Sequence, residues 1–427
     1  MSIAVSVITL FALFLANIPI AVSMIASVLV YFLLAQSIEP MVLVQRLIGG
    51  IESIPLLAVP FFIVAGAMMN YTGITQRLAK FAELITGRLP GGLAQVNVVL
   101  ATLMGGLSGS NIADAAMQTK ILYPEMVKRN YSPGFAAAVI ASAAQITPLI
   151  PPGIGMILYG YIGNVSIGKL FMAGVMPGLL TCVFLMVAIH FIAKKKGYAP
   201  IRTGPMPKGQ LFRASKDAIL ALLLPVAIIG GIRVGMFTPS EAGAVAVVYA
   251  LFLGVIFYRE MKWRDFTLAI RESVSTTASV LLIIAAGSAF GWILTWERIP
   301  QAATGFITGF VDSPFLFLIV VNVFLLILGM FVEGNVAIII LTPLLIPMAQ
   351  AYGIDPVHFG MVFLFNLSIG TLTPPLGTVM FTTCSIAKVK LEEFLKGMLP
   401  FYVVLLLLLL IITYVPAVSL WLPNLLM

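Results

Sequence analysis

The sequence predicts an all-α polytopic membrane protein built from two inverted repeats, each with one re-entrant helical hairpin and one proline-broken helix. Composition is the first observation: 61% of the 427 residues are hydrophobic, 9% are charged, and the mean hydropathy is +1.10. A soluble protein is roughly 45–50% apolar. Second, apolar stretches of about 20 residues, enough to cross ~30 Å of hydrocarbon, recur along the chain. Third, motifs of the first half recur in the second.

Ten apolar segments are predicted to cross the membrane. They lie at 2–16, 18–35, 53–70, 132–163, 169–192, 217–235, 240–257, 273–295, 356–385 and 398–421. The first has no basic region before it and no small-residue cleavage site, so we interpret it as a retained helix. Because Lys and Arg in short loops act as topology signals, the net charge of +8 does not indicate nucleic-acid binding.

Two further apolar stretches, 91–125 and 313–349, are interrupted midway by glycine and polar residues. Each is predicted to form two half-length helices folded into a re-entrant hairpin. The first tip, at 108–111, lies roughly 15–18 residues from each hairpin end, which is near mid-membrane at ~1.5 Å per residue. The second tip is Glu333-Gly334-Asn335. The spans that follow contain TPLIPPG (147–153) and TLTPPLG (371–377), where the prolines predict unwound backbone.

Matching residues recur at a nearly constant offset. Pro151-Pro152 corresponds to Pro374-Pro375, at 374 − 151 = 223 positions, and Asn111 corresponds to Asn335. Each half therefore contains, in order, two helices, an amphipathic linker, a helix, a hairpin and a broken helix. The linkers, at 36–52 and 259–271, are too polar to span and are expected to lie in the interface plane.

Positive charges orient the two halves in opposite directions. The loops beside the first hairpin are basic, whereas the equivalent loops of the second half carry only Arg298. The positive-inside rule places the first loops, and the basic linker after Lys194, in the cytoplasm. Both termini are then predicted to lie outside. The basic residues beside the first hairpin are Arg77, Lys80, Arg88, Lys128 and Arg129.

The repeat divides the chain into five predicted segments. Inverted repeats with discontinuous helices are typical of secondary transporters, whose sites lie near the midplane. We expect an elevator-like division, in which the hairpins and broken helices move together against a scaffold. The segments are scaffold helices with the first arm (1–90), the first transport half (91–163), scaffold helices with the cytoplasmic linker and second arm (164–312), the second transport half (313–385) and a C-terminal membrane helix (386–427).

The tips and breaks are the candidate binding sites. Carbonyl oxygens at half-helix ends can replace the water around a small hard cation, and half-helix N-termini favour an anion. Two tips and two breaks therefore predict two related cation sites flanking one anion site. Small and polar residues also serve helix packing in membranes. Their repetition at equivalent positions is what favours a site.

Two carboxylates lie near the tips. A carboxylate at mid-membrane is costly and indicates a function. Glu333 is therefore predicted either to tune a cation site or to gate the substrate, with a buried salt bridge as the alternative. Asp114, one turn beyond the first tip, is interpreted either as a ligand or as a cap of the half-helix N-terminus.

Ser108 lies in GLSG, which has the form of a nucleophilic-serine motif. A serine nucleophile needs a base, and His190 and His358 lie at span ends where neither is expected to meet it, so an intramembrane hydrolase is disfavoured. Cys182 and Cys384 form no CxxC or Cys/His cluster, and neither a disulfide nor a metal centre is predicted.

Three stretches together resemble the large membrane subunit of tripartite ATP-independent periplasmic (TRAP) transporters. They are GGLSGSNIADAAMQTKILYPEMVKRNYSPGFAAAVIASAAQITPLIPPGIGMILYG (105–160), VSIGKLFMAGVMPGLL (165–180) and GMFVEGNVAIIILTPLLIPMAQAYGIDPVHFGMVFLFNLSIGTLTPPLGTVMF (329–381). The resemblance covers essentially the whole chain. It implies an elevator similar to the ion transporter superfamily and sodium-coupled import of an organic acid. It also implies a periplasmic substrate-binding protein, a small four-helix membrane subunit and a bacterial or archaeal inner membrane.

The resemblance also implies the substrate class. Many members that resemble dicarboxylate carriers have Asp at the second tip and GPIIPPS in the first break. Glu333 and TPLIPPG stand at those positions here, and the sequence is most similar to the sialic-acid (N-acetylneuraminate) type. The alternatives are another carboxylate, such as a C4-dicarboxylate, and a one-chain proton-coupled carrier, which no dense Asp/Glu/His relay supports.

The implied site residues fall into two groups. Na⁺ is the implied coupling ion, with no organic cofactor. The sodium ligands are Gly106, Ser108, Asn111, Pro148, Pro151 and Gly153 in the first half, and Gly329, Gly334, Asn335, Gly370, Thr371 and Thr373 in the second. The substrate residues are Ser110, Asn111, Thr147, Glu333, Asn335 and Thr373.

Overall fold

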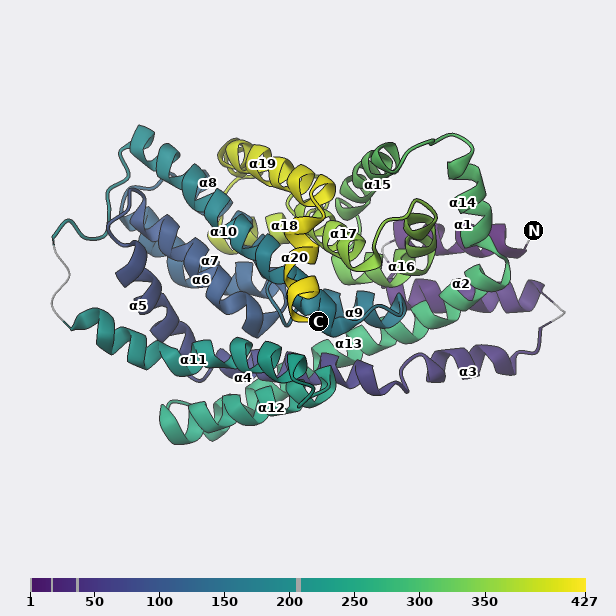
Figure 1. Ribbon diagram of the computed structural model, residues 1–427, viewed down its shortest axis with the longest axis horizontal. Helices are drawn as coiled ribbons and strands as arrows, with labels where there is room; N and C mark the ends of the chain where they lie inside the picture. The colour runs from purple at the N-terminus through teal and green to yellow at the C-terminus, as the bar shows by residue number, and fades with distance from the viewer. Residues whose placement is uncertain (1, 17, 36–37, 205–208) are drawn as a thin grey trace.

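The computed structural model describes residues 2–16, 18–35, 38–204 and 209–427, and every regular element within these ranges is a helix (Figure 1). The first half contains α1 (Ser2–Leu15), α2 (Ile20–Leu34), α3 (Met41–Gly49), the 3₁₀ turn η1 (Ile54–Leu57), α4 (Ala58–Met69), α5 (Ile74–Thr86), α6 (Gly92–Ser108), α7 (Asn111–Lys128), α8 (Pro133–Ala143), the 3₁₀ turn η2 (Ala144–Ile146), α9 (Ile154–Ile162) and α10 (Ile167–Lys196).

The second half repeats this order. It contains α11 (Gln210–Arg233), α12 (Pro239–Leu251), the π-helical turn η3 (Phe252–Phe257), α13 (Trp263–Trp296), α14 (Ile299–Thr308), α15 (Pro314–Gly329), α16 (Gly334–Ala351), α17 (Pro356–Gly370), α18 (Thr378–Ala387), α19 (Leu391–Tyr414) and α20 (Ala417–Leu426).

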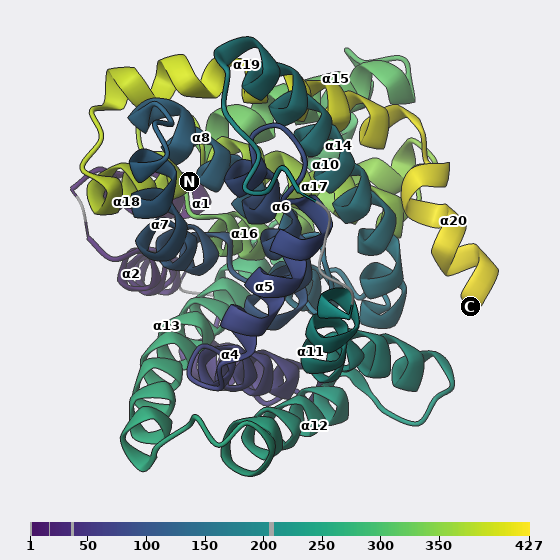
Figure 2. The ribbon, with the colours of Figure 1, turned by 90° about the vertical axis from the view of Figure 1, so that its left-hand side faces the viewer.

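The helices form two layers (Figures 1 and 2). The lower layer of both views contains α4, α11, α12 and α13, with α4 packed against α12 and α13. The hairpins and the broken helices lie above it. The main core extends through both layers, and a second apolar cluster joins α2 to the C-terminal part of α13.

Among the described residues, six helices are long and apolar enough to cross a membrane, or seven if α3 and η1–α4, which meet at 51°, count as one span. The predicted ten crossings differ from this number for two reasons: α1, α2 and the parts of each broken helix are short when taken singly, and α16, one of the six, was predicted as half of a hairpin. Long apolar helices with buried backbone hydrogen bonds suit a bilayer. The all-α polytopic fold is confirmed.

Both predicted hairpins are present. Gly109, at φ +61°, ends α6 in a left-handed turn, which glycine adopts at no steric cost. The Ser110 side chain then caps α7, accepting a hydrogen bond from the Ala113 N–H at 3.4 Å. In the second half, α15 ends at Gly329 and Glu333 occupies the N-cap position of α16. The predicted breaks also occur, because no helix covers 147–153 or 371–377.

The two halves interlock across the repeat. The returning helix of the first hairpin, α7, packs against α18 of the second broken helix. Its counterpart α16 packs in the same way against α9 of the first. This reciprocal exchange brings each hairpin tip to the break of the opposite half.

Three sequence expectations differ from the structure. The second linker, 259–271, was expected to be separate from the next span, but α13 begins within it at Trp263 and continues unbroken into the span, because no proline or glycine interrupts it before Gly287. The charged segment before the first hairpin was expected to be a loop, but it forms α5. The equivalent helix of the second half, α14, was not expected either. The span at 398–421 ends at Tyr414, because Pro416 separates α19 from α20.

Candidate functional site

A cavity of about 50 Å³ lies between the two hairpin tips. Four elements meet around it: both tips, the first break and the C-terminal end of α17. Its polar lining comes from Ser110, Asn111, Glu333, Asn335, Ser368 and Thr371, its backbone lining from Gly109, Pro148, Gly155 and Gly334, and its apolar lining from Ile112, Ile338, Leu364 and Leu367.

Gln145 and Ser368 mark the pseudo-two-fold axis. The Ser368 hydroxyl donates to Gln145 Oε1 at 2.5 Å, and the two residues are 223 positions apart. This is the offset of the repeat, so the bond joins equivalent positions of the two halves. Two equivalent positions can touch only at the axis that relates the halves. Both side chains are buried.

Asn111 extends this contact to the first tip. Its amide Nδ2 lies 3.3 Å from Gln145 Oε1 and 3.3 Å from Thr371 Oγ1, and donates to both. Thr371 in turn donates to the Ser368 carbonyl at 2.6 Å. A continuous set of hydrogen bonds therefore connects the first tip to the second break. With its amide group occupied as a donor, Asn111 retains its Oδ1 atom as an acceptor for a cation.

Glu333 faces the cavity from the second tip. One carboxylate oxygen accepts a hydrogen bond from Asn335 Nδ2 at 2.9 Å. Among the described residues the ion pairs are Arg77–Glu260 and Lys128–Glu125, so the salt-bridge alternative for Glu333 is not found there. A carboxylate next to an amide oxygen is a donor set suited to a hard cation.

The backbone of the first break lies directly against the first hairpin. A Cβ atom at Gly106 would stand 2.5 Å from the Pro151 carbonyl oxygen, and one at Gly109 would stand 3.1 Å from that of Pro152. Within the described part of the chain, no hydrogen bond reaches the carbonyls of Pro148, Pro151 or Pro152. Buried carbonyls that lack donors are the groups that coordinate sodium.

The second half has the same close approach. A Cβ atom at Gly329 would lie 3.0 Å from Gly370 Cα, and one at the equivalent Gly105 would lie 3.1 Å from Thr147 Cα. Thr373 donates its hydroxyl to the Gly370 carbonyl at 2.7 Å, and the Thr371 carbonyl accepts from the N–H groups of Val379 and Met380. More backbone carbonyls of the second break than of the first therefore already accept hydrogen bonds.

Thr147 and Asp114 lie beside the cavity but are absent from its lining. The Thr147 hydroxyl donates to Asp114 Oδ2, and both side chains are buried. The α7 N-cap is Ser110, so Asp114 is not the N-cap. Asp114 instead joins the first hairpin to the first break.

Seven predicted site residues line the cavity: Ser110, Asn111, Pro148, Glu333, Gly334, Asn335 and Thr371. Others stand behind them in the tips and breaks, namely Gly106, Thr147, Pro151, Gly153, Gly329, Gly370 and Thr373. The Ser108 side chain lies outside the described part of the structure. Sequence reasoning missed Gln145 and Ser368, although their 223-residue separation was a signal that they are equivalent.

A larger cleft of about 540 Å³ adjoins the tips. It lies between the lower-layer helices α4 and α13 and the tip residues Ser110, Glu333 and Asn335. The wall on α13 carries hydroxyl groups from Ser275, Thr276 and Ser279, and Asn70 lies in the lining directly after α4. The sequence signal for this wall is the STTAS run within α13.

Of the two histidines, His358 is held by hydrogen bonds away from the serine-nucleophile motif. His358 Nδ1 lies 2.7 Å from the Ser419 hydroxyl and its Nε2 lies 3.1 Å from the Thr413 carbonyl, so this ring joins α17 to the C-terminal helices. Within the described residues, no group of three His, Cys, Asp or Glu side chains could hold a metal ion. Cys182 and Cys384 are buried free thiols.

Replacing Ser368 with alanine is expected to destabilise the protein by about 1 kcal/mol, because Gln145 Oε1 loses a buried donor. Thermal unfolding of the purified protein in detergent measures this effect. Ser385→Ala, at an exposed position on α18, is the matched control and should leave the transition unchanged. Equal stability of Ser368→Ala and the control would contradict a structural role for the axial hydrogen bond.

The chain is similar to a family of known transporters. The family model of the DctM component of tripartite ATP-independent periplasmic transporters matches residues 7–418. The sialic acid TRAP transporter large permease protein SiaM of Vibrio cholerae is 39% identical over 413 residues, 97% of this chain and 96% of that protein. The C4-dicarboxylate TRAP transporter large permease protein DctM of Pseudomonas aeruginosa is 40% identical, covering 87% of each chain.

The fold also has a solved counterpart. The YdaH transporter of Alcanivorax borkumensis aligns with a TM-score of 0.60 at 14% identity, over 87% of this chain and 86% of that one. The likeness extends over most of both chains and concerns the fold. The family match, by contrast, rests on sequence over almost the entire length. This chain therefore belongs to the DctM family of tripartite ATP-independent periplasmic transporters, as a large permease subunit and not an enzyme.

Proposed function

We propose that this permease imports an organic acid, sialic acid, in symport with sodium across a bacterial inner membrane. The observation that carries the proposal is the convergence of both tips and the first break on one polar cavity. Oxygen ligands dominate that cavity, as sodium requires, and its lining among the described residues contains no cationic side chain. Discontinuous helices at a repeat interface are the usual place for coupling ions.

The first sodium site is assigned to the first tip and break. The carbonyls of Pro148 and Pro151, which accept no hydrogen bond from the described residues, support it, and that of Pro151 lies against Gly106. The second site is assigned to Glu333, Gly334 and Asn335 with the second break. A cation there would offset the charge of the Glu333 carboxylate, which is costly to hold uncompensated at this depth.

The substrate is assigned to the cleft of about 540 Å³ that adjoins the tips. This volume lies within the roughly 300–1,000 Å³ typical of small-molecule sites. Its hydroxyl-rich α13 wall suits a polyol, and the N-terminus of α7 at Ser110 and Asn111 suits a carboxylate. An elevator movement would carry the tips with the substrate past α4 and α13.

A C4-dicarboxylate is the second candidate. It is favoured by the 40% identity to the Pseudomonas protein named for that substrate. The relative named for isethionate, from Oleidesulfovibrio alaskensis, extends the range to a sulfonate. Two carboxylates would need a second anion-binding group in the cleft, where the described lining residues include Glu272 and Glu333 but no Lys or Arg. This charge pattern favours a monoanion.

The proposed assembly contains two partners. A small four-helix membrane subunit would cover the exposed apolar face of the scaffold, and a periplasmic binding protein would deliver the acid. The relative named DctMQ supports the first partner, because this chain aligns with 65% of its length and leaves room for a second component. Both termini are assigned to the outer side by the distribution of Lys and Arg.

Uptake into proteoliposomes tests the proposal. Labelled N-acetylneuraminate should accumulate only when an inward sodium gradient, the small subunit and the binding protein are all present. A potassium gradient of equal size is the control for the driving ion. Accumulation that is independent of sodium would overturn the proposed sodium coupling. Uptake without the binding protein would favour a one-chain carrier. Uptake of succinate but not of N-acetylneuraminate would show that the substrate is a C4-dicarboxylate.

A further inference from the structure

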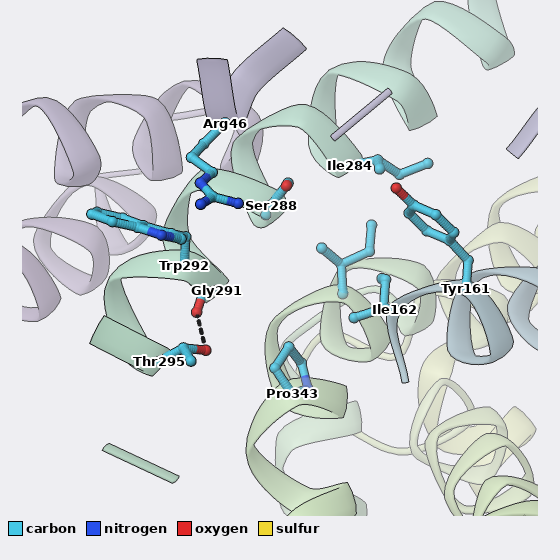
Figure 3. A pocket seen from close by; sticks show the side chains of 11 residues that line it. Arg46, Tyr161, Ile162, Ile284, Ser288, Gly291, Trp292, Thr295 and Pro343 are labelled. Carbon is cyan, nitrogen blue, oxygen red and sulfur yellow. Dashed lines mark hydrogen bonds between the residues drawn. The ribbon is translucent and has the colours of Figure 1, made fainter. Parts of the chain in front are cut away.

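A second cavity, of about 360 Å³, lies away from the tips (Figure 3). Four helices surround it: the interfacial arm α3, the C-terminal half of α13, the end of α9 and the middle of α16. The lining residues on α13 run from Ile284 to Thr295. The cleft at the tips uses the preceding part of the same helix, from Glu272 to Ile283. The two spaces therefore follow one another along α13.

Arg46 brings a positive charge to this cavity. Its guanidinium stands over the Trp292 ring, with Cζ 5.4 Å from the ring centroid (Figure 3). Among the described residues, no carboxylate lies within salt-bridge distance of Arg46, and the lining contains no Asp or Glu. A guanidinium has five N–H donors in a planar fork that matches a carboxylate.

Three hydroxyl groups also line the cavity, from Tyr161, Ser288 and Thr295. Ser288 lies next to it on α13 (Figure 3), and no hydrogen-bond partner for its hydroxyl is found in the described part of the chain. Tyr161 stands across the cavity, with its hydroxyl 3.3 Å from the Gly50 carbonyl. Thr295 donates to the Gly291 carbonyl and so is left as an acceptor.

Glycines on α13 keep the cavity open. A Cβ atom at Gly291 would meet only Pro343, at 3.6 Å, so a larger side chain there would point into free space. Apolar walls are provided by Ile162, Ile339 and Pro343. Ile339 is four residues beyond Asn335 on α16, about 6 Å along the helix axis at ~1.5 Å per residue. The cavity is therefore close to the tip site without sharing its residues.

We propose that this cavity is a separate oxyanion site, in which Arg46 holds the carboxylate of an organic acid and Trp292 covers its apolar face. This proposal rests on the proposed function in two respects: the bound acid belongs to the class that is transported, and the positive-inside topology places α3 on the outer side. The site would retain the acid at the outer end of the scaffold before it reaches the tips. A phospholipid phosphate offers the same chemistry, and the test separates the two sources.

Binding is measured without transport. The full chain is reconstituted in phosphatidylcholine nanodiscs in potassium buffer free of sodium, and tryptophan fluorescence is followed as potassium N-acetylneuraminate is added. A saturable change is expected, and Trp292→Phe should remove it. Arg46→Gln should weaken the apparent affinity about tenfold or more, since a charge-assisted hydrogen bond is lost. The affinity of Arg46→Lys should lie between that of the unaltered protein and that of Arg46→Gln.

Two further variants sharpen the result. Gly291→Leu keeps Arg46 and fills the cavity, so it should abolish the fluorescence change even if Arg46→Gln folds poorly. Arg298→Gln, which removes a cation outside the cavity lining, is the matched control and should bind like the unaltered protein. Equal affinities of Arg46→Gln and Arg298→Gln would overturn the proposal.

The lipid arm uses nanodiscs containing phosphatidylglycerol. If this lipid alone produces the Trp292 change and N-acetylneuraminate does not bind in either nanodisc, the ligand is a lipid phosphate and the organic-acid assignment is wrong. Failure of the proposed function would appear differently, as loss of sodium-driven uptake with binding at Arg46 retained.

Discussion

Gly370→Ala is expected to abolish uptake and to destabilise the protein by about 1–3 kcal/mol, the usual cost of overpacking. The added Cβ atom would stand 2.6 Å from Gly329 Cα and 2.7 Å from the Gly329 carbonyl carbon. Both are backbone atoms, so no flexible side chain can move aside. The second hairpin must then separate from the second break, which displaces the ligands on both.

Thermal unfolding and sodium-driven uptake of the purified variant check this expectation. Gly230→Ala on α11 is the matched control, because a Cβ atom there meets nothing within 4 Å. Alanine is the better helix former, so the control should be at least as stable as the unaltered protein. Full uptake by Gly370→Ala would show that the hairpin tolerates displacement and would contradict the close-contact argument.

Glu333→Gln is expected to raise the sodium concentration for half-maximal uptake about tenfold or more, since one charge-assisted ligand is lost. The amide has nearly the same shape and can still accept the hydrogen bond from Asn335 Nδ2, which lies 2.9 Å from the carboxylate. Only the charge changes. A carboxylate that faces an anionic substrate is repulsive unless a cation lies between them.

Uptake measured over a range of sodium and substrate concentrations separates the two roles of Glu333. Glu333→Asp keeps the charge and should retain part of the sodium affinity. Glu392→Gln, at an exposed carboxylate on α19, is the control for a general loss of charge. An unchanged sodium dependence with a raised substrate KM would instead make Glu333 a gate or a substrate contact.

Much of the architecture could be predicted from the sequence because it depends on local features. Apolar stretches fix the helices, and Gly109 with Ser110 fixes the first tip through a left-handed turn and an N-cap. Prolines fix the two breaks, since each removes a backbone donor. The linker at 259–271 was mispredicted because its polarity suggested a separate helix, whereas helical geometry continues wherever no breaker interrupts it.

The sequence by itself determined the membrane setting, the repeat, the hairpins and the family. Only the tertiary structure decided which side chains meet. Gln145 and Ser368 bond across 223 residues, and Arg46 on α3 reaches Trp292 on α13. Neither contact has a local signature, because each depends on how separate helices pack against one another. Periodicity and turn chemistry act over a few residues, while a binding site is formed by elements that the fold brings together.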